Sequence, residues 1–155
     1  MQNQQFKPEH FGIAPNPIPP MVHILPLNRN RGLLKYILLS IVTFGIYSIV
    51  FWSIVSTDIN TIATRHDGRN TMHYCFVFFL LAPITLGIFA IVWTHGLCNR
   101  IGRELQRRNL GYSFDASTFW LWGILGAFII VGPFIYMHKL CTAMNKLEES
   151  YNYYG

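Results

Sequence analysis

Three long apolar stretches alternate with polar ones along the 155-residue chain. Tyr36–Val55 and Tyr74–Trp93 each contain twenty residues without a charge, and Phe119–Met137 contains nineteen. About 20 apolar residues in a helix cross the ~30 Å hydrocarbon core of a bilayer, whereas buried helices of soluble proteins are typically shorter. The pattern therefore predicts three transmembrane helices, over about 33–55, 74–95 and 118–138.

The composition agrees with this prediction. Hydrophobic residues make up 52% of the chain and charged residues 12%, about half the charged fraction of an ordinary soluble domain. The alternative, a soluble all-α core, would need three helices that are apolar on every face with no second layer to cover them. We therefore predict an all-α fold, a helical integral membrane protein whose three transmembrane helices carry polar helical extensions.

The N-terminal 30 residues differ from the rest, because they contain six prolines and no apolar run that resembles a signal peptide. Closely spaced prolines break helices and favour an extended chain. We therefore predict a flexible proline-rich tail over 1–30, a three-span membrane domain over 31–152 and a short C-terminal tail over 153–155. A docking peptide for a partner is the alternative for the N-terminal tail.

The basic residues predict an orientation, because Lys and Arg near span ends favour the cytoplasm. With three spans, the N-terminal tail and the second loop share a side that carries Arg29, Arg31, Lys35, Arg100, Arg103, Arg107 and Arg108. The other side carries fewer, Arg65, Arg69, Lys139 and Lys146. We therefore expect a multi-pass protein of the cell membrane, with its N-terminus cytoplasmic and its C-terminus outside.

The second loop, "NRIGRELQRRNLG" over 99–111, continues the second span as an amphipathic helix, and Gly111 suits a left-handed cap. A basic helix at the cytoplasmic surface attracts anionic lipid at about 1 kcal/mol per charge. We therefore expect a lipid-facing basic surface made of Arg100, Arg103, Arg107 and Arg108, with topology anchoring alone as the alternative. The stretch has no aromatic residue, so no nucleic-acid partner is expected.

A weak internal repeat links the spans. "TFGIYSIVFW" begins at Thr43 and "TLGIFAIVW" at Thr85, and a polar extension that ends at a glycine follows each. Glycines within the spans favour close helix packing. Broken helices around a transported substrate are the alternative, although the apolar runs carry none of the charges that usually mark an ion path.

These motifs, the closing "MNKLEESYN" and the arginine-rich loop resemble a bacterial membrane-protein family of unknown function, DUF 4234. The resemblance covers roughly Arg31 to Asn152. Its most specific part is a Gly-Ile-aromatic motif followed by Trp, present at Gly45, Ile46, Tyr47 and Trp52 and again at Gly87, Ile88, Phe89 and Trp93. The third span departs from it at Pro133. The resemblance implies a small multi-span protein of the bacterial inner membrane, without an assigned activity.

Two His-Cys pairs, His95 with Cys98 and His138 with Cys141, offer metal-ligand types on one helix face. Consecutive span ends would lie on opposite faces of a ~30 Å core, while zinc holds its ligands within ~2.3 Å, so we expect no shared metal site. Ser53 and Ser56 hold the matching positions in the first unit, which indicates polar helix ends. A site that adds residues of the outer loop to the second pair is the alternative: His66, Asp67 and His73.

Other polar and aromatic positions have structural interpretations. Tryptophans at span ends predict an aromatic belt: Trp52, Trp93, Trp120 and Trp122. Residues at the start of each polar extension are expected to bond between helices or to cap a kink: Asp58, Asn60, Asn99 and Asn145. Asp115 is expected to be the N-cap of the third span.

The sequence contains no nucleophile-base pair, phosphate-binding loop or metal motif. We therefore expect no catalytic, cofactor-binding or metal-binding residues, and a non-enzymatic protein that acts through protein or lipid contacts. Its partners would be the bilayer, a second copy or another membrane protein. Two alternatives stay open: a subunit of an oligomeric transporter or channel, and a membrane-embedded enzyme that uses the outer histidines and thiol with a metal.

Overall fold

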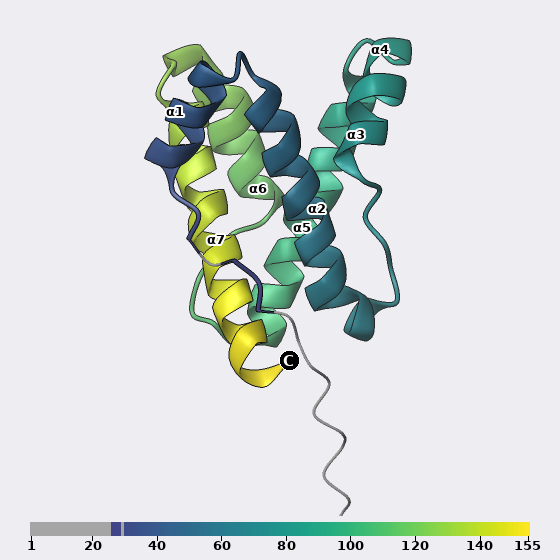
Figure 1. Cartoon of the computed structure of the whole chain (residues 1–155), viewed down its shortest axis with the longest axis vertical. Helices are drawn as coiled ribbons and strands as arrows, with labels where there is room; N and C mark the ends of the chain where they lie inside the picture. The colour runs from purple at the N-terminus through teal and green to yellow at the C-terminus, as the bar shows by residue number, and fades with distance from the viewer. Residues whose placement is uncertain (1–25, 29) are drawn as a thin grey trace, which may run out of the picture.

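A computed structural model describes residues 26–28 and 30–155, and in this part of the chain all regular secondary structure is helical (Figure 1). The all-α prediction is therefore confirmed for the described residues. The predicted N-terminal tail lies largely outside them. At the other end, helix α7 continues to Tyr154, so the last residues extend the fold and do not form a separate tail.

Each apolar run folds into a hairpin of two helical arms joined by a short turn. The first hairpin pairs α1 (Leu33–Val42) with α2 (Ile46–Asp67). In the second, the first arm is built from three short segments and packs on α5 (Ile88–Arg107); these segments are α3 (Tyr74–Phe76), the π-helix η1 (Val77–Leu81) and α4 (Ala82–Ile84). In the third, a similar composite arm packs on α7 (Gly132–Tyr154); its segments are α6 (Ala116–Thr118), the π-helix η2 (Phe119–Ile124) and the 3-10 helix η3 (Leu125–Ile129).

Ring contacts across each hairpin show that its two arms lie side by side. The Tyr36 and Phe51 rings are 4.9 Å apart in the first hairpin, and the Tyr74 and Trp93 rings are 5.2 Å apart in the second. None of the three predicted spans, over about 33–55, 74–95 and 118–138, is therefore one continuous helix. The physical cause lies in the middle of each run, where the backbone takes positive φ values that end an α-helix.

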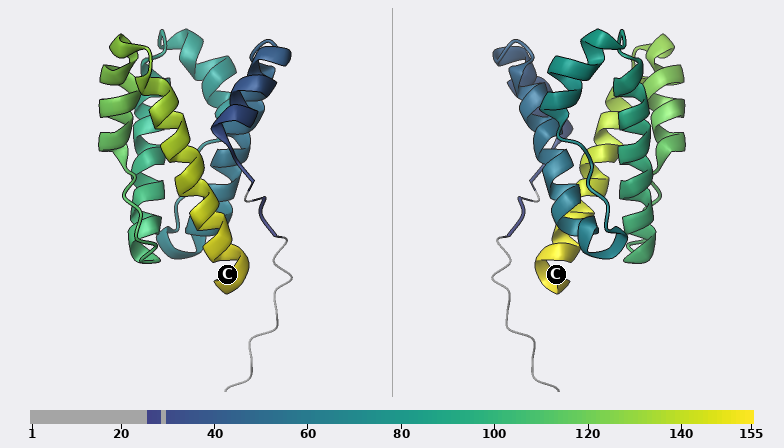
Figure 2. Two further views of the ribbon diagram at one scale, coloured as in Figure 1. Left: turned by 90° about the vertical axis from the view of Figure 1, so that its left-hand side faces the viewer. Right: turned by 90° about the vertical axis from the view of Figure 1, so that its right-hand side faces the viewer.

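The three hairpins point in the same direction, with their turns at one end of the molecule and their connections at the other (Figures 1 and 2). The longer arms α2, α5 and α7 contact one another pairwise and form the centre of the bundle. At the connection end, the Leu27 N–H donates to Asn152 Oδ1 over 2.8 Å. The two ends of the described chain thus lie together, which disagrees with the prediction that the membrane separates them.

The core has an aromatic layer and an aliphatic layer. The Trp52 ring lies 6.0 to 6.5 Å from the rings of Tyr74, Trp93 and Tyr136, so one tryptophan joins all three hairpins. Toward the connection end the central helices bury aliphatic side chains, each worth about 1.5–3 kcal/mol when fully removed from water: Ile59, Ile62, Leu97, Ile101, Leu140 and Leu147. Trp52 and Trp93 therefore serve the core, whereas Trp120 is 45% exposed and suits the predicted belt.

A close backbone approach at Gly102 fixes α5 against the segment that precedes α6. A Cβ built on Gly102 would overlap the Phe114 carbonyl oxygen and press on Asp115, whereas a Cβ on Gly96 of the same helix would meet nothing within 4 Å. The contact at Gly102 therefore admits no side chain.

We expect Gly102→Ala to lower the free energy of unfolding by about 1–3 kcal/mol, because the added methyl group forces a backbone shift. Gly96→Ala, the matched control, should be neutral or stabilise by up to about 1 kcal/mol through helix propensity. Denaturant or thermal unfolding in mild detergent measures both changes. Equal effects of the two substitutions would contradict the packing described for Gly102.

Candidate functional site

Each of the three hairpin turns carries a large apolar side chain that is almost fully exposed. Phe44, Leu86 and Phe128 are 97%, 93% and 86% exposed. Their neighbours are also more than half exposed: Val42, Ile46, Ile84, Ile88, Ile129, Ile130 and Val131. We call this set of ten residues the apolar tips. Because all three hairpins point the same way, the apolar tips form one end of the molecule (Figure 2).

Charged residues stay away from this end. None occurs in 36–57, 70–99 or 116–138. The charge nearest in sequence to the first turn is Lys35, seven residues before Val42. The charge nearest to the third turn is Lys139, seven residues after Gly132. Long lysine side chains can extend along an apolar surface to reach water. The molecule therefore has an uncharged end and a charged end.

The first two turns have the same conformation. Phe44 and Gly45 have φ values of 51° and 88°, and Leu86 and Gly87 have 51° and 87°. Glycine adopts positive φ without a steric penalty, whereas other residues rarely do. The two copies of the Thr-X-Gly-Ile motif thus specify the same sharp turn between helical arms. Gly45 and Gly87 therefore interrupt the helices, and they are not sites of close packing within continuous ones.

The turn satisfies its own backbone amides. The N–H groups of Thr43, Phe44, Gly45 and Ile46 donate to carbonyl oxygens of residues 39, 41, 40 and 43 over 2.7 to 3.2 Å. The next amide, of Tyr47, donates to Thr43 Oγ1 over 2.9 Å, and that hydroxyl donates to the Leu39 carbonyl over 2.7 Å. Five consecutive amides therefore need no water.

Thr85 repeats this arrangement in the second turn. Its hydroxyl donates to the Leu81 carbonyl over 2.7 Å and accepts from the Phe89 N–H over 3.1 Å. The third turn uses different means: Gly126 and Gly132 are in backbone contact, Ile130 has φ 63°, and Pro133 lies in the first turn of α7, where its missing N–H leaves no donor to satisfy. The threonine two residues before each glycine was the sequence signal for the first two turns.

At the charged end, asparagines hold the segments that lead into the hairpins. The Asn60 side chain accepts from the Thr71 N–H over 2.7 Å and donates to the Thr71 carbonyl over 2.8 Å. Asn145 makes the same pair of bonds with Arg31, at 3.1 and 2.8 Å, and Asn99 accepts from the Ala116 N–H over 3.4 Å. Each long helix thus binds the start of another hairpin, and α7 closes the ring by binding the first.

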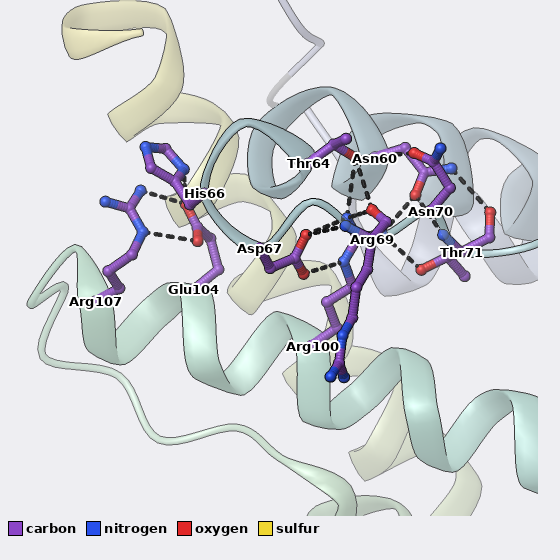
Figure 3. Close-up of polar contacts among 10 residues, drawn as sticks. All are labelled: Asn60, Thr64, His66, Asp67, Arg69, Asn70, Thr71, Arg100, Glu104 and Arg107. Carbon is purple, nitrogen blue, oxygen red and sulfur yellow. Dashed lines mark hydrogen bonds and ion pairs between the residues drawn. The ribbon is translucent and has the colours of Figure 1, made fainter.

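Arg100 ties α5 to the connection that follows α2 (Figure 3). Its guanidinium is almost completely buried and binds both Asp67 carboxylate oxygens, at 2.8 and 3.0 Å. It also contacts the polar groups of the same connection: Asn60, Thr64, Arg69 and Thr71. Nearby, burial would raise the pKa of Glu104, but its bonds to Arg107 and Arg108 outweigh burial and hold that pKa below the ordinary value.

These contacts change the interpretation of the predicted basic surface. Arg100 and Arg108 are buried in ion pairs, while Arg103 and Arg107 are exposed. All four lie at the charged end, since Arg100 is already about 18 Å along α5 from the tip at 1.5 Å per residue. The four arginines therefore do not form one exposed surface. The prediction failed because the spacing of the arginines in the sequence does not reveal their acidic partners, Asp67 and Glu104.

The two His-Cys pairs lie at similar heights on α5 and α7, and Cys98 Sγ is 3.3 Å from the hydroxyl of Tyr136. The predicted separation on opposite faces is therefore wrong. His95 nonetheless accepts from Trp120 over 3.0 Å, and burial raises the pKa of the Cys98 thiol to about 12 and that of Cys141 to about 11. A raised thiol pKa disfavours the thiolate, which is the form that binds metal.

The alternative metal site of the outer loop does not assemble among the described residues. His66 Nδ1 lies 3.6 Å from Glu104, and Asp67 binds Arg100. Within residues 26–28 and 30–155, no three His, Cys, Asp or Glu side chains are grouped so that they could hold a metal ion. The expected N-cap is confirmed, since Asp115 Oδ1 accepts from the N–H groups of Ser117 and Thr118.

A buried ion cluster connects the N-terminal segment with α2 and α7. Arg31 Nη2 contacts Asp58 Oδ2 and lies 2.8 Å from Glu148 Oε1. Glu148 is completely buried. Burial raises the pKa of Glu148 to about 8; the Arg31 charge opposes this rise and the Asp58 charge adds to it.

Together these features define, over the described residues, a helical fold of three parallel hairpins with one apolar end and one polar end. Residues 31–103 match the family described as "Domain of unknown function (DUF4234)", so the resemblance seen in the sequence is confirmed for this part of the chain. The match spans the first hairpin and most of the second, and its description assigns no activity. Comparison with curated proteins and with solved structures found no match.

The Glu148 site predicts a pH dependence of stability. Because the pKa of Glu148 is raised from 4.5 to about 8 on folding, its contribution is fully present below pH 4.5 and is lost as the pH rises through 8. Between pH 5 and pH 8.5 we expect the free energy of unfolding to fall by a few kcal/mol.

Glu148→Gln should flatten this decline, because the neutral amide has no proton to lose. Unfolding of both proteins in detergent, measured at several pH values with matched ionic strength, tests the difference. A variant that keeps the full pH slope would show that another group causes it.

Proposed function

We propose that this chain is a membrane protein whose apolar tips enter the bilayer from one side, and that it acts through contacts with lipid and protein. The observation that carries the proposal is the collection of ten exposed apolar residues on three parallel turns. Exposed apolar patches on this scale mark sites of protein or membrane contact. Transfer of large apolar side chains out of water yields about 1.5–3 kcal/mol each when complete.

The dimensions fit insertion into one leaflet. The first arm, α1, has ten residues, which corresponds to about 15 Å or half of the ~30 Å hydrocarbon core. Lys35 and Lys139, seven residues from their turns, would then reach the headgroup layer by extension of their side chains. The exposed Trp120 lies at a comparable distance along its arm and suits the same layer.

The turns are chemically suited to lipid. An unsatisfied backbone group in hydrocarbon costs several kcal/mol, and the N–H groups from Thr43 to Tyr47 all have acceptors. Of the described helices, α2 alone is long and apolar enough to cross a bilayer, which by itself is weak support for a span. Its second half, however, carries Asp58 and joins the polar end, which favours hairpins inserted from one side over three spans.

The proposed mode of action is binding and not catalysis. Several of the buried charged groups pair with one another and are thereby held as structural contacts: Arg31 with Asp58, Arg100 with Asp67, and Glu104 with two arginines. The proposed location is the cell membrane, as the family resemblance implies for bacteria. The proposed partners are the bilayer and, through the exposed sides of the hairpins, a second copy or another membrane protein.

Charges placed on the tips should release the protein from membranes. We expect Phe44→Asp with Leu86→Asp to cost about 2.5–3.5 kcal/mol for each carboxylate inserted, which shifts the protein from the membrane to the soluble or aggregated fraction. Vesicle flotation measures this distribution. Thr57→Asp with Thr61→Asp, two exposed positions toward the polar end of α2, serve as the matched control and should float normally. Equal flotation of both pairs would contradict tip insertion.

Labelling separates hairpins inserted from one side from three spans. Residues 70 and 113 lie in the connections before the second and third hairpins and are exposed. In oriented membranes, a membrane-impermeant thiol reagent should therefore modify Asn70→Cys and Ser113→Cys from the same side. Modification from opposite sides would establish the three-span topology and end the proposal of one-sided insertion.

A further inference from the structure

We propose that a pocket at the start of the first hairpin binds the phosphate of an anionic phospholipid. The pocket has a volume of about 120 Å³ and lies between the N-terminal segment and the hairpin. Its polar wall contains Arg31, Gly32 and Lys35, and its apolar wall contains Tyr47, Phe51 and Ile54. The choice of a lipid as the source of the phosphate rests on the proposed function. The affinity of the pocket for a phosphate group is argued from the pocket itself and is independent of that function.

The first observation is an uncapped helix start. Helix α1 begins after Gly32, no side chain caps it, and its first turn contains no acidic residue. The first helical bond inside the arm runs from the Tyr36 N–H to the Gly32 carbonyl, so the preceding amides of Leu33 to Lys35 have no acceptor within the helix. Such a terminus presents N–H donors and the positive end of the helix dipole to an anion.

The second observation is an independent donor that lacks an acceptor. The Arg31 side chain is only 8% exposed, and Nη2 faces Asp58 and Glu148. Its other terminal nitrogen, Nη1, is buried and has no hydrogen-bond partner among the described residues. Buried donors without acceptors are rare and destabilising, and an anion in the pocket would supply one. Neither acid lines the pocket.

The third observation is the charge at the mouth. Lys35 is exposed and forms no ion pair within the described part of the chain. Lys35, Arg31 and Gly32, the residue before α1, all line the same pocket. The oxygens of a phosphate can accept charge-assisted hydrogen bonds from lysine and arginine side chains and from the free N–H groups of a helix start.

The depth of the pocket favours a lipid over free phosphate. Ten residues of α1 separate the pocket from the tip, a distance of about 15 Å. If the tip reaches the middle of the bilayer, the pocket lies at the level of the headgroups. The apolar wall then faces the glycerol and upper acyl region of the same lipid, which inorganic phosphate would leave uncovered.

The full-length protein can be tested by flotation with phosphatidylcholine vesicles that contain or lack phosphatidylglycerol. Gly32→Asp caps the helix and places a carboxylate where the phosphate would bind; since a Cβ at this position meets nothing within 4 Å, the fold should survive. Gly32→Ala is the uncharged control. Lys35→Gln and Lys139→Gln each remove one lysine seven residues from a turn, but only Lys35 lines the pocket.

We expect the preference of the natural protein for phosphatidylglycerol to be lost in Gly32→Asp and kept in Gly32→Ala. Removal of one cation near an anionic surface lowers affinity about fivefold, so Lys139→Gln should lose no more than this and Lys35→Gln should lose more. Equal losses in the two lysine variants, or an unchanged preference in Gly32→Asp, would overturn the pocket.

Amide NMR of the detergent-solubilised protein separates the two proposals. The Leu33 to Lys35 amide signals should shift with short-chain phosphatidylglycerol and not with inorganic phosphate at the same concentration. Shifts with both would assign the pocket to free phosphate and overturn the lipid assignment; shifts with neither would overturn the pocket. If the natural protein fails to float with neutral vesicles, tip insertion fails, while the amide signals still report on the pocket.

Discussion

The whole arrangement depends on how the backbone amides of two short turns are satisfied. At Thr43 and Thr85 a side-chain hydroxyl accepts the amide that the helix break leaves without a carbonyl, and the glycine that follows takes the left-handed conformation. This permits an uncharged run of twenty residues to fold in half without exposing donors. Parallel hairpins, a common apolar end and a polar end with all the connections follow from that local chemistry.

The sequence predicted the helical class, the apolar segments and the Asp115 cap, because these depend on composition and local propensity. It did not predict the hairpins. Length alone favoured spans, although Thr-X-Gly-Ile in the middle of two runs carried the signal for a turn. The spacing of four arginines likewise suggested a surface, whereas Asp67 and Glu104 bury two of them. Such pairings join residues far apart in sequence, and no local pattern identifies them.

The polar end combines two kinds of contact with different energetic roles. Asparagine side chains bind backbone groups of the incoming segments, so they fix position with little dependence on the sequence that they hold. The buried ion clusters around Arg31 and Arg100 add specificity for a particular side chain, since loss of one partner leaves a buried charge uncompensated. The uncharged end needs neither, because the packed aromatic layer joins the hairpins there.

The ring of asparagines also has a consequence for biosynthesis. Leu27 and Arg31 bond to Asn152 and Asn145, which are 125 and 114 residues later in the chain. A nascent polypeptide can form the first turn, and the Arg31 side chain can pair with Asp58, as soon as α2 has emerged. The backbone N–H groups of Leu27 and Arg31 gain their asparagine acceptors only when the last helix has left the ribosome. Backbone anchoring at Leu27 and Arg31 is therefore a late event of assembly, and shortening α7 from its end would release Leu27 before Arg31.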